Sequence, residues 1–485
     1  MDRWRAWLSG IVQILAPAWR RMFLGVCLAG LGYVAFLPAF EGRHEVEHAL
    51  ALESFASSGR IVLSQSAALD PDLLGYAGPW PAVYESETRP GYAQSEDHPS
   101  QTHLYRAHPL TLVLLTPARL LSQSWSWPDR VGLYRSVLWS FAMIGFGAAL
   151  LAGLRYAFLD QRVAVFMAAW PFVFPQFFAQ MSGLGGAGAA LGCLGVACAS
   201  AMALSRRNEL MASLGLGLAL GLGMWADTLV VSVWAGLAAH LVWRGWRLHK
   251  DGALDGEWLI LRVFAMGLAL LIGAGWLIFS LTSAQGTPIS PVLAPGFFQR
   301  FWSVIASFSA EGGASMILPA PGLRLIPLAL LVLVLIRWEA HWRSLQSLNQ
   351  ALAFILPVFL LSALLMGLQG HASDFGDLHM LAPFLGVIFA LFCRQSVLAL
   401  ALVMLSILAS LAMGLVQVSV YSGCALFDPA TGRYSYEASS CLLDWQALEA
   451  VSAPGLALKL LALGAVSAGS ALFTLWRQAA WQRSD

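Results

Sequence analysis

The chain has 485 residues, of which 58% are hydrophobic and only 11% are charged, and its formal net charge is +1. Its mean hydropathy is +0.68. Soluble domains carry about a quarter charged residues, so this chain lacks the polar surface that a water-soluble globule of its size needs. The near-neutral net charge gives no basis for a nucleic-acid partner, and we expect none. The composition therefore predicts an integral membrane protein whose main surroundings are a lipid bilayer.

Apolar segments long enough to cross a bilayer recur along the whole chain, and they number about twelve. The backbone of a lipid-embedded segment has to satisfy its own hydrogen bonds, and segments of this length do so as helices. The fold class that we expect is therefore all-α, a polytopic membrane protein whose first span is uncleaved. The expected spans are residues 22–40, 131–154, 163–180, 183–204, 210–224, 227–243, 258–281, 325–336, 351–368, 380–393, 396–420 and 456–476.

The basic residues indicate how the spans are oriented. If the N-terminus is cytoplasmic and each span crosses once, most loop arginines fall inside, among them Arg155, Arg206 and Arg247. Cytoplasmic loops are enriched in Lys and Arg, so we expect an inner (plasma) membrane protein with both termini in the cytoplasm. Residues 108–121 are apolar but form only about three to four helical turns. Since crossing there would invert every later loop, we expect a juxtamembrane or re-entrant helix at the outer face.

On this topology the polar mass of the chain lies at the outer, periplasmic face. We divide the chain into a first transmembrane module, residues 1–281, and a C-terminal transmembrane module, residues 282–485. Cys424 and Cys441 share the last outer loop, and in an oxidising compartment we expect them to form a disulfide. The outer loops are residues 41–130 in the first module and residues 282–322, 370–379 and 421–454 in the second.

Histidines and carboxylates gather in the outer loops. Ionisable groups are energetically costly at a membrane edge, so a cluster of them there indicates a functional site. The string His44-Glu45-Val46-Glu47-His48 also reads H-E-x-x-H, which on a helix would give two zinc ligands and a general base. One alternative function is therefore a zinc metalloprotease. A second is a polysaccharide or lipid transporter or polymerase. Transporters show internal repeats and midplane charges, and here only Asp227 is a candidate interior charge.

Several motifs, in a fixed order, resemble the GT-C superfamily of membrane glycosyltransferases, a group that includes protein O-mannosyltransferases and the lipid A aminoarabinose transferase. The resemblance covers most of the N-terminal half. It departs from the family in having glutamates where an aspartate is usual after the first span, and in lacking a second acid in residues 181–190. The motifs are the acidic helix 41–60, His108-Pro109-Leu110, Arg135-Ser136, the glycine-rich segment 214–228 and the segment from Asp377 through His379 to Pro383.

The resemblance implies a GT-C-like helical bundle that moves a sugar from a polyprenyl-phosphate donor to an acceptor at the outer face. Such a reaction needs a carboxylate to take a proton from the acceptor, for which Glu45 is the first candidate, followed by Glu47 and Glu41. It also needs groups that hold the departing phosphate. A divalent metal held by His44 and His48 is the one cofactor considered, and the acceptor stays unidentified. The candidate phosphate-binding residues are Arg43, Arg106, Arg135, Arg300, Arg324, His108 and His379.

Overall fold

The computed structural model of the chain describes residues 13–37, 45–58, 108–156, 161–173, 176–227, 229–283, 425–428, 433–436 and 454–481, with a few isolated positions between 384 and 408. The helices, in chain order, are α2 (Ala18–Phe36), α3 (Glu45–Ser58), α6 (Pro109–Leu121), α7 (Trp127–Tyr156), α8 (Gln161–Ala169), the 3-10 helix η1 (Trp170–Val173), α9 (Gln176–Ser182), α10 (Ala187–Arg206), α11 (Leu210–Ala226), α12 (Val230–Lys250), α13 (Gly256–Ser283) and α21 (Pro454–Trp481).

The long helices are apolar on the outside as well as the inside, as in a membrane protein. Within the described part of the chain, four stretches are long and apolar enough to cross a bilayer: Trp127–Tyr156, Ala187–Arg206, Gly256–Gly275 and Gly455–Gln478. Side chains such as Ile144, Leu271 and Val466 point outward and are exposed. An outward apolar surface of this extent is unfavourable in water and favourable in lipid. The described chain is therefore a helical bundle of an integral membrane protein, and the total of about twelve spans stays a prediction.

The helices agree closely with the expected spans, with one correction. Residues 163–180 were expected to form one span, but the structure divides them into α8, η1 and α9. Pro171 lies in η1 and has no N–H to donate to the preceding turn, so a regular α-helix ends before it. The four spans expected between residues 325 and 420 lie outside the described residues, apart from the isolated positions there.

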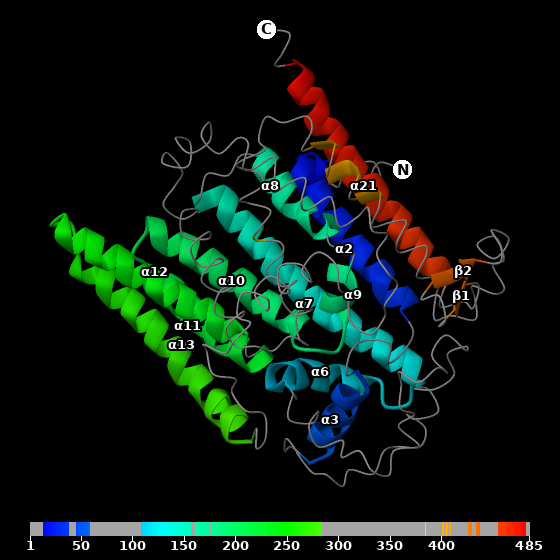
Figure 1. Ribbon diagram of the computed structural model, residues 1–485, viewed down its shortest axis with the longest axis horizontal. Coiled ribbons are helices and arrows are strands. Elements are labelled where there is room, and N and C mark those ends of the chain that lie inside the picture. The colour runs from blue at the N-terminus through cyan, green and yellow to red at the C-terminus, as the bar shows by residue number, and fades with distance from the viewer. Residues whose placement is uncertain are drawn as a thin grey trace, which may run out of the picture.

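Small residues let the central helices approach closely, as is common between membrane helices. Helix α7 crosses α10 where Gly145 meets Gly192 and Gly195, and a Cβ atom added at Gly145 would lie 2.0 Å from the Gly192 carbonyl oxygen. Helix α21 packs along α2 (Figure 1). There Gly25 and Gly464 face each other, and a Cβ added at Gly25 would lie 2.8 Å from the Gly464 oxygen. The first and last described helices are therefore neighbours in space.

The structure adds one feature to the all-α fold class. Strands β1 (Ala425–Asp428) and β2 (Arg433–Tyr436) form an antiparallel hairpin, with Phe427 opposite Tyr434. Its two strands are joined by the sequence Pro-Ala-Thr-Gly, and prolines and glycines favour turns. The hairpin falls in the expected last outer loop, 421–454. Cys424 and Cys441 lie outside the described residues, so their disulfide stays a prediction.

Candidate functional site

Two short helices, α3 and α6, lie across one end of the bundle (Figure 1). Helix α6 has 13 residues, a length of about 20 Å, which is too short to cross the roughly 30 Å hydrocarbon core. It contacts α3, α7 and α11. The start of α10 and the end of α11 reach the same place, because a Cβ added at Gly186 would meet both the Ala226 oxygen and the His108 ring. Polar side chains from separate parts of the sequence therefore gather at this end.

A buried ion pair lies at the centre of this region. Arg135 on α7 donates from Nε to Glu45 Oε1 (2.9 Å) and from Nη2 to Glu45 Oε2 (2.5 Å). Each of the two side chains is 1% exposed. Arg135 Nη1 also donates to the Leu37 carbonyl at the end of α2 (2.6 Å), and the Leu184 amide donates to Glu45 Oε1 (3.2 Å). The pair therefore joins α2, α3, α7 and the turn between α9 and α10.

Two histidines face each other next to this pair. His48 lies one helical turn after Glu45 on α3, and its ring centroid is 5.3 Å from that of His108. His48 is 9% exposed, whereas His108, the residue before α6, is half-buried. A Cβ added at Gly186 would lie 2.7 Å from His108 Nδ1 and 1.8 Å from the Ala226 oxygen. The glycine is therefore needed for the close approach of the His108 ring and the end of α11.

We expect Gly186→Ala to destabilise the protein by about 1–3 kcal/mol, the usual range for overpacking, because its methyl group would clash with backbone. Gly185→Ala is the matched control, since a Cβ there meets only His48 Nε2 at 3.9 Å, an ordinary contact. Unfolding of the two purified variants in detergent compares them. Equal stability of the two variants would show that the turn does not pack against His108 and Ala226 in this way.

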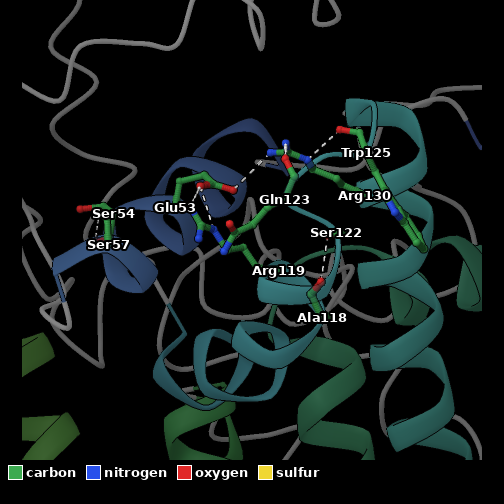
Figure 2. A network of polar contacts seen from close by, with 9 residues as sticks. All are labelled: Glu53, Ser54, Ser57, Ala118, Arg119, Ser122, Gln123, Trp125 and Arg130. Carbon is green, nitrogen blue, oxygen red and sulfur yellow. Dashed lines mark hydrogen bonds and ion pairs between the residues drawn. The ribbon is translucent and has the colours of Figure 1, made fainter.

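A second carboxylate on α3 forms a separate network, away from the histidines. Glu53 Oε2 accepts hydrogen bonds from Arg119 Nε (3.0 Å) and Nη2 (2.7 Å), and Glu53 Oε1 lies 3.7 Å from Arg130 Nη1 (Figure 2). The hydrogen bonds that Arg119 donates to Glu53 raise the pKa of the Arg119 guanidinium above its ordinary value. Arg130 Nε also donates to the Trp125 carbonyl (2.9 Å). These contacts connect α3 to α6 and to the start of α7, and the sequence analysis did not identify them.

Glu53→Gln should change stability only slightly, by about 1 kcal/mol or less. The side chains of Glu53 and Arg119 are 26% and 20% exposed, and solvent screening makes partly exposed ion pairs weak. The neutral amide still accepts a hydrogen bond from Arg119. Unfolding of the purified variant measures the change, and a loss of several kcal/mol would mean that this network carries much more of the fold than its exposure indicates.

Asp227 lies in the turn between α11 and α12, at the same end of the bundle. It is 3% exposed, and its Oδ1 accepts a hydrogen bond from the Leu229 amide (2.8 Å). A carboxylate that accepts a bond from the amide two residues later is a common turn motif. Asp227 therefore serves the turn at a helix end, whereas the transporter alternative had treated it as an interior charge.

The structure brings together Glu45, Arg135, His48 and His108 among the predicted site residues. Glu47 belongs to α3. Among the described residues no three His, Cys, Asp or Glu side chains are close enough to hold a metal ion, so the metal and protease hypotheses gain no support there. The predicted residues outside the described part of the chain are Glu41, Arg43, His44, Arg106, Arg300, Arg324 and His379.

No family profile and no curated protein sequence matches the chain. Solved structures do match, among them two of ArnT from Cupriavidus metallidurans. The apo structure has a TM-score of 0.52 at 14% identity, over 95% of this chain and 76% of that one. The structure bound to undecaprenyl phosphate has a TM-score of 0.49 at 14% identity, over 98% and 78%. The apo comparison shows that the chain shares its fold with ArnT, in agreement with the fold that the resemblance to the GT-C superfamily implied.

Proposed function

We propose that this chain is a membrane glycosyltransferase that moves a sugar from a polyprenyl-phosphate donor to an acceptor at the outer face. The observation that carries the proposal is the position of α3 and α6, which lie across one end of a GT-C bundle (Figure 1). There they hold Glu45, His48 and His108 close together. A donor with a polyprenyl tail partitions into the bilayer and an acceptor arrives from water, so such a reaction belongs at the membrane edge.

The proposed orientation puts α3 and α6 outside and both termini in the cytoplasm. The basic residues support it, because Arg155, Arg206 and Lys250 close helices α7, α10 and α12 at the end away from α3 and α6. At the α3 end, Arg119 and Arg135 form ion pairs with Glu53 and Glu45. An excess of Lys and Arg marks the cytoplasmic side of a membrane protein.

Transfer is tested with the purified full chain in liposomes that contain undecaprenyl-phosphate-linked sugars, by following the release of undecaprenyl phosphate. A panel of sugars, mannose and aminoarabinose among them, is paired with lipid and protein acceptors. We expect release that depends on an acceptor and reaches a steady rate. Glu53→Gln, which changes the same helix away from the histidines, should keep that rate. Failure both to bind undecaprenyl phosphate and to transfer any sugar would contradict the proposal.

The orientation is tested by cysteine labelling in whole cells. A cysteine in place of Ser95 should react with an impermeant maleimide from outside, because loop 41–130 is expected there. A cysteine in place of Ser205, near the end of α10, should react only after the cells are opened. Labelling of position 205 in intact cells would invert the proposed topology.

A further inference from the structure

We propose that His108 is the proton acceptor of the transfer reaction, and that the Glu45–Arg135 pair positions it, through His48, without taking the proton itself. This inference rests on the proposed function and refines its site. It differs from the roles that the family resemblance implies, in which Glu45 is the base and His108 holds phosphate.

Glu45 is already engaged by the groups around it. Both of its oxygens already accept bonds from Arg135, and Oε1 accepts a further bond from the Leu184 amide. With 1% exposure, this carboxylate has no surface through which an acceptor hydroxyl arrives. A carboxylate whose two oxygens are already engaged by a guanidinium and a backbone amide offers an acceptor hydroxyl little room to form a hydrogen bond.

The Glu45–Arg135 pair holds the start of α3 in place. Glu45 is the first residue of α3, and Arg135 connects it to the end of α2 through the Leu37 carbonyl. The direction of α3 is therefore fixed at its first turn. His48 lies one turn later on the same helix, where residues three apart share a face. The ion pair thereby sets the place at which His48 meets His108.

The two histidines differ in how exposed they are. His48 is buried, with Nε2 toward Gly185, whereas His108 is half-buried. The His108 ring lies close to Gly186, which also approaches the end of α11. His108 is therefore the more accessible group of the pair, and His48 supports its orientation. An imidazole changes charge near neutral pH, which suits a general base.

The acceptor oxygen forms a bond to the anomeric carbon of the sugar, and the bond from that carbon to the phosphate oxygen breaks. Polyprenyl phosphate leaves with the electron pair of that bond. The proton of the acceptor passes to a nitrogen of neutral His108 and from there to water. Of the described carboxylates at this end, Glu45 accepts hydrogen bonds from Arg135 through both oxygens, and Asp227 accepts one from the Leu229 amide through Oδ1.

His108→Lys distinguishes the proposed role of His108 as a base from the alternative role of holding the phosphate. Lysine supplies a positive charge for a phosphate, and with its ordinary pKa of about 10.4 it is protonated near pH 7 and does not accept a proton. We expect this variant to bind undecaprenyl phosphate within a few-fold of the wild type and to transfer sugar about 10² times more slowly or worse, the usual scale for loss of a general base. In His108→Ala, added imidazole should restore part of the rate. Full transfer by His108→Lys would assign His108 to the phosphate and overturn the proposal.

Glu45 is tested with Glu45→Gln and with the double variant Glu45→Gln/Arg135→Met. If Glu45 only positions, the double variant regains most of the transfer that Glu45→Gln loses, because neither charge is then left buried alone. If Glu45 is the base, the double variant stays as slow as Glu45→Gln while remaining folded, and the proposal is wrong. A wild type that neither binds the lipid nor transfers sugar would remove the proposed function itself, which is a different result from an active His108→Lys.

Discussion

Arg135→Met should unfold far more easily than the wild type, with a loss of about 3–5 kcal/mol, the range seen when one partner of a buried ion pair is removed. The substitution leaves the Glu45 carboxylate buried at 1% exposure and removes both hydrogen bonds from the guanidinium, while the bond from the Leu184 amide remains. It also removes the donor to the Leu37 carbonyl. Four segments lose their common point of contact in one step.

The double variant Glu45→Gln/Arg135→Met provides the control for this prediction. A neutral amide still accepts the bond from Leu184, and methionine fills much of the arginine volume. Replacing both charges of a buried pair is often close to neutral, so the double variant should be clearly more stable than Arg135→Met. Unfolding of all four proteins in one detergent gives the coupling energy. A coupling near zero would mean that the two side chains do not form this pair in the protein.

Gly145→Leu should prevent α7 and α10 from packing. Even a single Cβ at this position would lie 2.0 Å from the Gly192 oxygen, and a Cβ at Gly195 would lie 2.2 Å from Gly145 atoms in turn. Both contacts are with backbone, so a side-chain rotation does not relieve them. We expect a loss at or above the upper end of the overpacking range, about 3 kcal/mol, and a low yield of monodisperse protein.

Gly132→Leu is the matched control on the same helix. A Cβ at Gly132 meets nothing within 4 Å, so this variant should be purified and should unfold like the wild type. Size-exclusion profiles and thermal unfolding of both variants make the comparison. If Gly145→Leu behaves like Gly132→Leu, the close crossing of α7 and α10 is wrong.

The spans were predictable because hydropathy depends on local composition. Helices α7, α10, α11 and α13 lie within a few residues of the segments read from the sequence. The break at Pro171 was missed because the surrounding residues are apolar, and hydropathy does not register a missing N–H. The hairpin β1–β2 was missed because four-residue strands give little signal beside a 28-residue helix.

The site was predictable in its residue types but not in its pairings. An arginine at residue 135, within a largely apolar helix, needs a partner, and the first-loop glutamates were the available carboxylates. The sequence did not indicate that Glu45 is the partner, since 90 residues separate the two. The Glu53–Arg119–Arg130 network was missed for the same reason: its members belong to three helices whose relative placement is set by tertiary packing.

The contact of α2 with α21 has a consequence for biogenesis. Arg21 on α2 donates to Thr474 on α21 (2.7 Å) across a separation of 453 residues. At a synthesis rate of about 5–20 residues per second, the ribosome needs roughly 20–90 s to make the intervening chain. During that time the face of α2 that carries Gly25 contacts lipid, the insertion machinery or a chaperone in place of α21. Helix α21 therefore packs against α2 only after α2 has been inserted. We expect the speed of translation and the presence of chaperones to affect this packing.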